Sequence, residues 1–540
     1  MLFNSIEFAI FLIVVYAFYL VLPFRGQNWL LLVSSYIFYG WWDWRFLFLM
    51  IFSTSIDFWT GLVLHRGRLR RKEIVVPAAF LSSAGVLLVG FNTSEIFHRL
   101  MGDTPSVPLV TPMMPFVIVG IPTYFVVAAV VYHALNSLSK ESRRRACMIL
   151  SIVAQLTVLG FFKYFDFFAQ SLTETLASIG VRAPMFYVNI VLPVGISFYT
   201  FQSMSYAIDI YRRELKPTNR FFDFALFVSF FPQLVAGPIE RAKNLLPQMS
   251  LPRRVAWDRV RRGVFLIVFG LFKKIAIADG IAGTADTAFA IKDPSWATVV
   301  LGTAAFTVQI YADFSGYSDI ARGVAKLFGV ELMHNFNLPY FARSPREFWQ
   351  RWHISLSTWL SDYLYRPLGG NRGNLAFTCR NLMLTMVLGG FWHGAAWNYL
   401  LWGFYQGCVL TCHRVLRAKV GPAHDGAVKR LLKICAFGAV TLYGWLLFRA
   451  RSFAQIETYT SILFTGRGGF SLDAARPGFS AAIGTMLLAT WEIVQYRSGA
   501  GPKFYRALPA PLVGFALAAM VFLTLMGMSN EPAQFIYFQF

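Results

Sequence analysis

Charged residues are scarce in this 540-residue sequence, and acidic residues are scarcer than basic ones. Asp, Glu, Lys and Arg make up 14% of the chain, whereas a soluble protein carries about 25%. Hydrophobic residues make up 56%, and no long polar stretch leaves room for a separate soluble domain. The composition therefore predicts an all-α, multi-pass membrane protein that forms one domain over residues 1–540.

The sequence also lacks the short motifs of several common chemistries. It has no Walker loop, no GxGxxG turn after a strand, no HExxH zinc motif and no GxSxG nucleophile elbow. Its five cysteines form no CxxC pair. Cys408 and Cys412 lie beside His413, but small residues in a membrane helix explain their spacing better than zinc ligands do. We therefore expect neither a metal site nor a permanently bound cofactor.

Basic residues give the chain a net charge of +22. They gather in short loops between apolar segments, which indicates membrane topology and contact with anionic lipid, not nucleic-acid binding. The positive-inside rule places these loops in the cytoplasm. The clusters occupy residues 65–72, 140–145, 212–220, 253–262 and 414–430.

The apolar segments between these loops predict about eleven spanning helices, with shorter re-entrant or interfacial elements between them. Residues 188–210 are one expected span, residues 221–249 are too interrupted by proline and glycine to be another, and residues 529–540 are expected outside. One group of arginines falls in a predicted outer loop, against the rule. These are Arg449, Arg451, Arg467 and Arg476.

The string SPREFWQRWHISLSTWLSDYLYRPLGGNRG begins at Ser344. Ser344 suits a helix N-cap, Pro345 suits the first turn, and Glu347 occupies the reciprocal capping position. Apolar and aromatic residues then recur at spacings of three and four, with His353 and Ser357 on the opposite face. The pattern predicts a helix lying at the membrane boundary, with His353 in a basic, interfacial segment.

His393 occurs in a second string, LGGFWHGAAWNYLLWG. Residues 382–404 contain no other Asp, Glu, Lys, Arg or His. His393 follows Arg380 by thirteen residues, which corresponds to roughly 20 Å of helix. Because the hydrocarbon layer is about 30 Å thick, His393 is expected inside the membrane. An ionisable residue at that depth is a functional candidate by default.

These strings resemble the membrane-bound O-acyltransferase (MBOAT) family, and within it the bacterial alginate O-acetyltransferase branch. REFWQRWHISLSTWLSDYLYRPLGGNR and GGFWHGAAWNYLLWG carry most of the likeness. PVGISFYTFQSMSYAIDIYR, FVSFFPQLVAGPIER and YADFSGYSDIARG add to it, as do LFNSIEFAIFLIVVYAFYLVLP and WLLFRA. The resemblance extends over nearly the whole chain, and long strings in this order are more specific than WHG alone.

The resemblance implies a bundle around a central tunnel, with a catalytic core over residues 140–415. It implies an O-acyltransferase of the bacterial inner membrane that uses cytoplasmic acetyl-coenzyme A as its donor substrate. The acetyl group would emerge outside and pass to a periplasmic SGNH-type transferase. That partner would acetylate a polysaccharide acceptor such as alginate or a similar exopolysaccharide, cellulose or peptidoglycan.

Catalysis is expected at His393, as a general base or a transient acyl carrier, with His353 assisting proton transfer or holding the donor. Asp313 is expected either to orient a histidine or to pair with a basic residue, because a carboxylate in an apolar segment needs a partner. Asn398 could orient His393 or make a helix–helix hydrogen bond. The candidates for orienting groups or tunnel lining are Asp313, Asn398, Ser357 and Trp392.

Residues 369–373 (GGNRG) suggest either a nest of backbone N–H groups for the donor phosphates or a plain tight turn. Arg346 and Arg351 are expected to contact either those phosphates or anionic lipid. The donor-binding candidates are Arg346, Arg351, Arg372 and Gly370.

Two other functions stay open. A related branch moves D-alanyl groups from a carrier-protein thioester to teichoic acid, but it shares the REFWQRWHISLSTWL string less closely. A transporter or flippase for a lipid-linked sugar would need polar sites that switch conformation but no histidine base. His393→Gln, which keeps a polar group without the base, distinguishes a transporter from an enzyme.

Overall fold

The structure is a computed structural model in which helices dominate the described residues. Apart from helices, these residues form turns, loops and one isolated bridge between Phe91 and Val110. The prediction of an all-α protein is therefore confirmed. The description covers the chain apart from residues 101–106, 182–187, 236, 421–425, 471–476, 500–508, 530–532 and 537–540.

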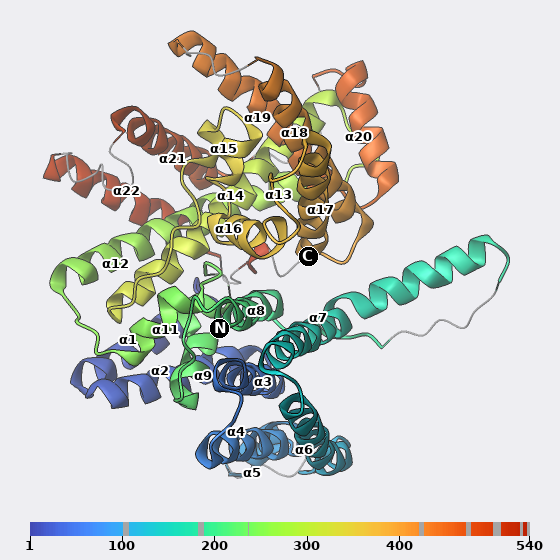
Figure 1. The fold of residues 1–540 in the computed structure, drawn as a ribbon. Coiled ribbons are helices and arrows are strands. Elements are labelled where there is room, and N and C mark those ends of the chain that lie inside the picture. The colour runs from blue at the N-terminus through green and yellow to red at the C-terminus, as the bar shows by residue number, and fades with distance from the viewer. Residues whose placement is uncertain are drawn as a thin grey trace.

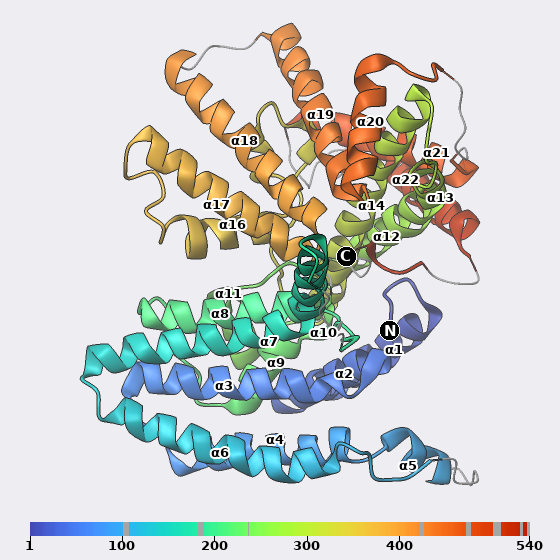
Figure 2. The same ribbon diagram turned by 90° about the vertical axis from the view of Figure 1, so that its right-hand side faces the viewer.

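The helices lie in layers that largely follow chain order (Figure 1 and Figure 2). The N-terminal helices form the lower layers in both views, and the C-terminal helices form the upper part. The far end of α7 (Lys140–Ser178) projects from the bundle at the right of Figure 1. The other elements of the lower layers are α1 (Ile6–Val21), α2 (Phe24–Asp43), α3 (Phe46–Arg66), α4 (Arg71–Ala84), η1 (Gly85–Gly90), α5 (Thr93–Leu100), α6 (Met114–Asn136) and α8 (Ile196–Tyr211).

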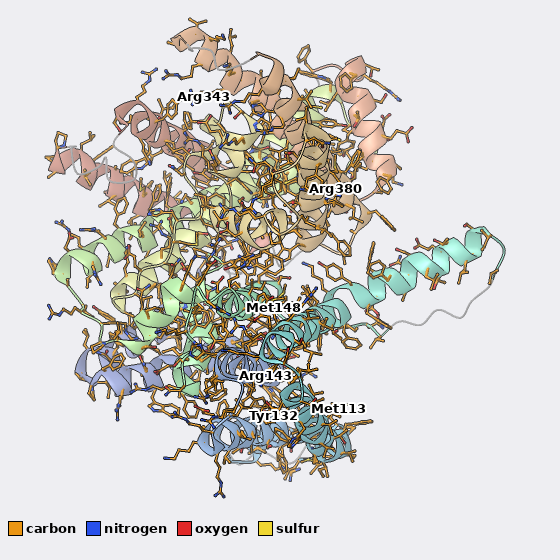
Figure 3. The ribbon with its side chains drawn as sticks, viewed as in Figure 1. Met113, Tyr132, Arg143, Met148, Arg343 and Arg380 are labelled. Atoms are coloured by element: carbon orange, nitrogen blue, oxygen red, sulfur yellow. The ribbon has the colours of Figure 1, made fainter. Side chains whose placement is uncertain are left out.

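Two of the predicted cytoplasmic loops lie at one end of these layers. The Leu69 N–H donates to the Tyr132 hydroxyl at 3.2 Å. The Arg143 guanidinium packs so closely on Gly67 that a Cβ added there would lie 2.4 Å from an arginine nitrogen. Figure 3 shows Tyr132 and Arg143 in the lower half of the view, with Arg343 and Arg380 in the upper half. The loop at residues 65–72 therefore meets the one at 140–145, as a common cytoplasmic side requires.

The centre of the bundle is α14 (Trp296–Leu327), which is buried along most of its length. Ser295 caps its N-terminus by accepting from the Thr298 N–H at 3.1 Å. It packs against α12 (Trp257–Leu271), η2 (Phe272–Asp279) and α13 (Gly280–Ala288). The wider η2 turn is a π-helix, and it directs two consecutive lysines toward the carboxylates of α14.

Residues 221–249 form short, buried helices, as their prolines and glycines predict. Together with the C-terminal helices they complete the bundle. These elements are α9 (Phe221–Ser229), α10 (Phe231–Leu234), α11 (Ala242–Ser250), α18 (Trp397–Val420), α20 (Phe453–Thr465) and α21 (Phe479–Ser498).

Within the described residues, eight helices are long and apolar enough to cross a membrane. The chain is therefore a multi-pass membrane protein, and the number eleven stays a prediction. The eight are α3, the continuous pair α4 and η1, α6, α7, α14, α17 (Leu375–His393), α19 (Ala427–Arg449) and α22 (Ala510–Gly527).

The spanning helix predicted over residues 188–210 is wrong at its N-terminal end. The helix begins only at Ile196, because Pro193 and Gly195 interrupt the pattern and Gly195 has a φ of +75°. The preceding loop is held by Asp166 of α7, whose carboxylate accepts from the N–H groups of residues 188 and 190 at 3.1 and 2.9 Å.

Two arginines of the predicted outer loop have acidic partners that the positive-inside rule does not consider. Arg449 pairs with Asp286 at 2.6 Å, and Arg467 pairs with Asp293 at 3.1 Å. Each pair joins the loop to the segment between η2 and α14, and Arg476 lies outside the described residues. These two arginines therefore form ion pairs within the protein, and their position is weak evidence for the side of the membrane on which the loop lies.

The C-terminal tail is predicted to lie on the extracytoplasmic side, which stays a prediction, and its described residues 533–536 pack into the helix bundle. Phe535 and Ile536 are buried. The Ile536 N–H donates to Asp313 at 2.6 Å, and the Lys274 ammonium donates to the Gln534 carbonyl at 3.1 Å. The buried lysine–aspartate pair thus supplies hydrogen bonds to a tail whose apolar side chains pack against α14.

Candidate active site

The single helix predicted after Ser344 is broken between Trp349 and Ile354. Ser344 does cap the first piece, accepting from the Glu347 N–H at 3.3 Å. The break follows because His353 adopts the left-handed conformation, with a φ of 41°. No three- or four-residue spacing reveals such a turn. The first piece is α15 (Pro345–Trp349), preceded by η3 (Pro339–Phe341), and the second is α16 (Ile354–Leu360) with η4 (Ser361–Tyr365) directly after it.

His353 is fully buried, so its predicted place on an interfacial surface is wrong. Its Nδ1 lies 3.1 Å from the side-chain oxygen of Asn335, which also accepts from the Ser355 hydroxyl at 2.9 Å. Because an amide oxygen only accepts, this contact favours a ring proton on Nδ1. The edge of Phe314 packs on the imidazole with ring centroids 4.6 Å apart. The left-handed turn therefore delivers the imidazole into the core of the bundle.

His393 is the last residue of α17, and it is 5% exposed. Gly394 ends the helix in extended conformation, where a Cβ would lie 2.2 Å from the Tyr399 ring. The chain then reverses, and α18 begins at Trp397. The apolar run at residues 382–404 is therefore a helical hairpin with His393 at its turn. The rings around the imidazole are those of Trp392, Trp402 and Phe448, with centroids at 5.1, 5.2 and 5.5 Å.

Trp392 contacts both histidines. Its ring centroid lies 6.1 Å from that of His353 and 5.1 Å from that of His393. Phe201 packs against the indole at 5.4 Å and stacks on Trp359 at 3.9 Å. His353 and His393, which come from separate strings in the sequence, therefore lie in one buried aromatic site, and the Trp392 ring packs on both of them.

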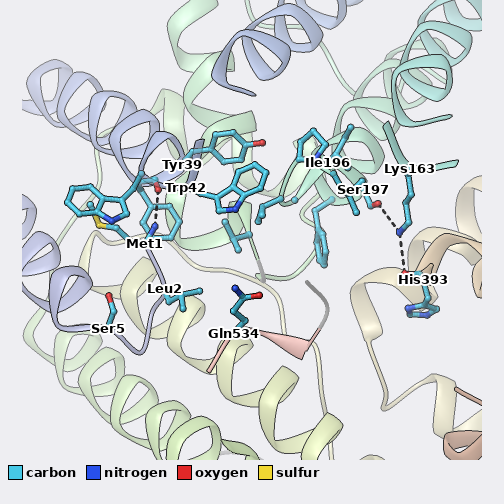
Figure 4. A pocket seen from close by; sticks show the side chains of 18 of the residues that line it. Met1, Leu2, Ser5, Tyr39, Trp42, Lys163, Ile196, Ser197, His393 and Gln534 are labelled. Atoms are coloured by element: carbon cyan, nitrogen blue, oxygen red, sulfur yellow. Dashed lines mark hydrogen bonds between the residues drawn. The ribbon is translucent and has the colours of Figure 1, made fainter. Parts of the chain in front are cut away.

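A cavity of about 510 Å³ reaches this site from one end of the bundle (Figure 4). It is lined by the start of α1, the end of α2, the residues before α8, and His393 with Trp392. These helix termini lie opposite the Arg212 end of α8, where the basic loops gather. The cavity therefore opens on the end of the bundle away from the basic loops.

A second cavity, of about 520 Å³, lies on the side of the basic loops. Arg262 of α12 and Lys326 of α14 line it, together with His334 and Asn335. Burial, with Arg322 beside the ring, lowers the pKa of His334 to about 4, so His334 is neutral at physiological pH. Asn335 also contacts the His353 imidazole, so a residue that lines this cavity touches the first histidine.

Lys163 of α7 is a site residue that the sequence reasoning missed. Its ammonium donates to the carbonyls of Trp392 and His393 at 2.6 and 3.2 Å. Figure 4 shows it between Ser197 and His393 on the cavity wall. The signal was present, because a lone lysine within the apolar string FFKYFDFF is as unusual at membrane depth as a histidine.

Three of the predicted orienting residues have other partners. Asp313 pairs with Lys274 at 2.9 Å, which is the structural alternative and not the orientation of a histidine. The Asn398 amide donates to the carbonyls of residues 448 and 450 at 3.3 and 3.0 Å, so it makes the helix–helix bond. The Ser357 hydroxyl donates to the Trp352 carbonyl at 3.1 Å. Of the four candidates, Trp392 is the one whose side chain packs on both histidines.

The donor-binding candidates lie apart from the histidines. Arg346 and Arg372 are exposed. Arg351 pairs with Glu347 at 2.9 Å and donates to the Asn337 carbonyl. The Gly370 N–H donates to the Tyr365 carbonyl at 2.9 Å, and the neighbouring N–H groups of residues 369 and 372 also donate within the turn. The GGNRG segment therefore has the geometry of a tight turn more than that of a phosphate nest.

The fold and the site together define a multi-pass helical protein with two neighbouring buried histidines. One cavity is lined by His393, and a second cavity, from the other end, is lined by Asn335, which contacts His353. Residues 136–453 match the model of MBOAT, the membrane-bound O-acyltransferase family. The chain belongs to this family and is a membrane-bound O-acyltransferase.

Several curated proteins are similar to the chain over most of its length. The probable alginate O-acetylase AlgI of Azotobacter vinelandii is 36% identical over 92% of this chain and 85% of that protein. The probable alginate O-acetylase AlgI of Pseudomonas aeruginosa is 38% identical over 84% of this chain and 72% of that protein. The peptidoglycan O-acetyltransferase of Helicobacter pylori is 35% identical over 63% of this chain and 68% of that protein.

Proposed function

We propose that this chain transfers an acetyl group from cytoplasmic acetyl-coenzyme A across the bacterial inner membrane for O-acetylation of an extracytoplasmic polysaccharide. Similarity to alginate O-acetylases and a peptidoglycan O-acetyltransferase supports an acetyl group and a polysaccharide acceptor. The proposal includes a secreted SGNH-type transferase that passes the acetyl group to the acceptor.

One observation carries this proposal: cavities from opposite ends of the bundle approach the same pair of histidines. The cavity on the side of the basic loops reaches Asn335, which holds His353. The cavity from the other end reaches His393, and Trp392 contacts both imidazoles. A charged donor crosses a bilayer only at great cost, whereas a small acyl group can pass between two such cavities.

In the proposed reaction a hydroxyl group of the secreted partner attacks the thioester carbonyl, and the partner later passes the acetyl group from this ester to a polysaccharide hydroxyl. The new C–O bond forms and the C–S bond breaks. His393 takes the proton from the hydroxyl and returns it to the sulfur, so that coenzyme A leaves as a thiol. His353 assists proton transfer or holds the donor, and the exposed Arg346 and Arg372 remain candidates for contacting its phosphates.

The test measures turnover of radiolabelled acetyl-coenzyme A by the purified protein in detergent, with its secreted partner and acceptor present. His393→Ala and His393→Gln should each lower the rate by about 10²–10⁴-fold, which is the usual contribution of a general base. His65→Ala is the matched control, because His65 is exposed at the end of α3. That variant should keep the full rate.

A second measurement separates chemistry from folding. The His393 variants should elute as a single species and melt within a few degrees of the unsubstituted protein, because the imidazole is packed by rings that glutamine still contacts. Full turnover in His393→Gln would refute His393 as the base. Turnover of a D-alanyl carrier-protein thioester but not of acetyl-coenzyme A would assign the chain to the other acyl donor.

A further inference from the structure

Two consecutive residues of α7 hold the C-terminal end of α17, where His393 is located. The Tyr164 hydroxyl donates to the Phe391 carbonyl at 3.0 Å, and its ring stacks on that of Phe391 at 4.2 Å. The Lys163 ammonium donates to the next two carbonyls along the chain, at 2.6 and 3.2 Å. Three consecutive carbonyls, at residues 391–393, therefore each receive a hydrogen bond from α7.

These carbonyls belong to the last turn of α17, where the helix has no N–H groups of its own to offer. The final four carbonyls of a helix lack intrahelical partners, and the helix dipole concentrates partial negative charge there. Gly394 turns the chain away in extended conformation, so α17 has no following residue in a left-handed cap. A lysine ammonium and a tyrosine hydroxyl from α7 replace that cap.

The hydrogen bonds of the Lys163 amino group are directed at this helix end. Within the described part of the chain, Lys163 forms no ion pair with a carboxylate, and its further hydrogen bond is to the Ser197 hydroxyl at 3.5 Å. Asp166, one turn along the same helix, faces the N–H groups of residues 188 and 190 instead. The ammonium also lies 5.7 Å from the Trp392 ring centroid, which adds a cation–π contact to the same helix end.

We infer that Lys163 and Tyr164 are positioning residues for the transfer reaction, which fix the backbone of His393 by capping α17 from α7. The inference rests on the proposed role of His393 for its effect on rate. Its structural part, that this pair holds the end of α17, stands independently of the reaction. Lys163 lines the cavity beside His393, so small molecules in solution reach the position of its side chain.

The test combines hydrogen–deuterium exchange with kinetics on the full-length protein. Lys163→Ala and Tyr164→Phe should each speed exchange in the peptide spanning residues 391–397. Tyr405→Phe is the matched control, because it removes a hydroxyl that donates to a carbonyl of α19 at 2.7 Å, away from this helix end. It should leave exchange in residues 391–397 unchanged. Equal exchange in Lys163→Ala and the unsubstituted protein would overturn the inference.

Kinetics then distinguish positioning from a general loss of structure. Lys163→Ala should lower kcat roughly 100-fold, the cost of displacing a reacting group by about 1 Å, and leave KM for acetyl-coenzyme A unchanged. Propylamine, which replaces the deleted part of the lysine, should restore both the rate and the slow exchange. The neutral propan-1-ol should restore neither. A Lys163→Ala variant that is inactive and insensitive to propylamine would contradict a positioning role for the ammonium.

Failure of the proposed function gives a different pattern. In that case acetyl-coenzyme A is not turned over by the unsubstituted protein, whereas exchange in residues 391–397 still rises in Lys163→Ala and falls again with propylamine. Turnover in the unsubstituted protein with no change in Lys163→Ala, by exchange or by rate, overturns the positioning inference alone.

Discussion

The crossing of α17 and α18 should tolerate no side chain at Gly390. A Cβ added there would lie 2.4 Å from the Tyr399 carbonyl oxygen and 2.8 Å from the Gly403 Cα. Both atoms belong to the backbone of α18, so neither can swing aside as a side chain would. Restoring ordinary van der Waals separations requires the helices to move apart by roughly 1 Å. Small residues at such crossings are typical of close helix packing in membranes.

His393 follows Gly390 on the same helix, one turn away from the crossing. A shift of about 1 Å at the base costs about 100-fold in rate, or ~2.7 kcal/mol of activation free energy. Overpacking adds a loss of about 1–3 kcal/mol in stability. We therefore expect Gly390→Ala to be expressed and inserted, to melt at a lower temperature, and to lose most of its acetyl transfer.

Gly389→Ala is the matched control. At Gly389 the added Cβ would meet only the tip of the Leu360 side chain, at 3.1 Å. That side chain can rotate away, and alanine favours a helix over glycine by about 1 kcal/mol. Gly389→Ala should therefore keep its melting temperature and most of its rate. Full activity in Gly390→Ala, or equal losses in the two variants, would refute the argument that this crossing sets the position of His393.

Two further predictions concern charge. Lys274→Met leaves Asp313 and Asp279 buried without the cation they share, which should cost about 3–5 kcal/mol in unfolding free energy and release the tail; an unchanged melting temperature would contradict this. For Glu347, partial burial raises the pKa, but hydrogen bonds from Arg343 and Arg351 lower it more, to a net value below 4.5. Its ion pairs should therefore stabilise the protein above pH 4.5, and this contribution is lost as the pH falls through the folded-state pKa. The melting temperature of Glu347→Gln should lie below that of the unsubstituted protein at pH 7 and approach it in acid. A gap that persists or widens in acid would oppose this assignment.

The sequence predicts the fold class and singles out His353 and His393 as candidate site residues, because each of these features leaves a strong signal in the sequence. Apolar composition and basic loops report on the solvent around each segment, and they do not depend on how the helices pack. His393 stands alone in an apolar run, which marks it without any structure. The same rule applies to Lys163, which lies in the aromatic string FFKYFDFF.

The arrangement around His353 could not be predicted from spacing. Its string repeats apolar residues every three or four positions across the break, so the pattern is that of one helix. The break depends on a left-handed residue whose cost is repaid by burial of the imidazole against Asn335 and Phe314. Those partners come from other parts of the chain, and local pattern carries no information about them.

The partners of buried polar residues also depend on distant parts of the chain, although the need for a partner is visible in the local sequence. Asp313 needed a cation or a histidine, and the sequence could not decide which because Lys274 reaches it only through the wider η2 turn. The buried tail depends on this same pair. Local rules thus identify which residues require a partner, and the tertiary fold selects the partner.

The most direct test of the central claim uses sealed vesicles in which the protein is oriented with its basic loops outward. Labelled acetyl-coenzyme A is added outside, and the secreted partner with its polysaccharide is enclosed. The account predicts labelled acetyl esters on the enclosed polysaccharide, no coenzyme A inside, and loss of the label with His393→Gln. Equal label with His393→Gln, or intact acetyl-coenzyme A inside the vesicles, would contradict acyl transfer through the two-histidine site.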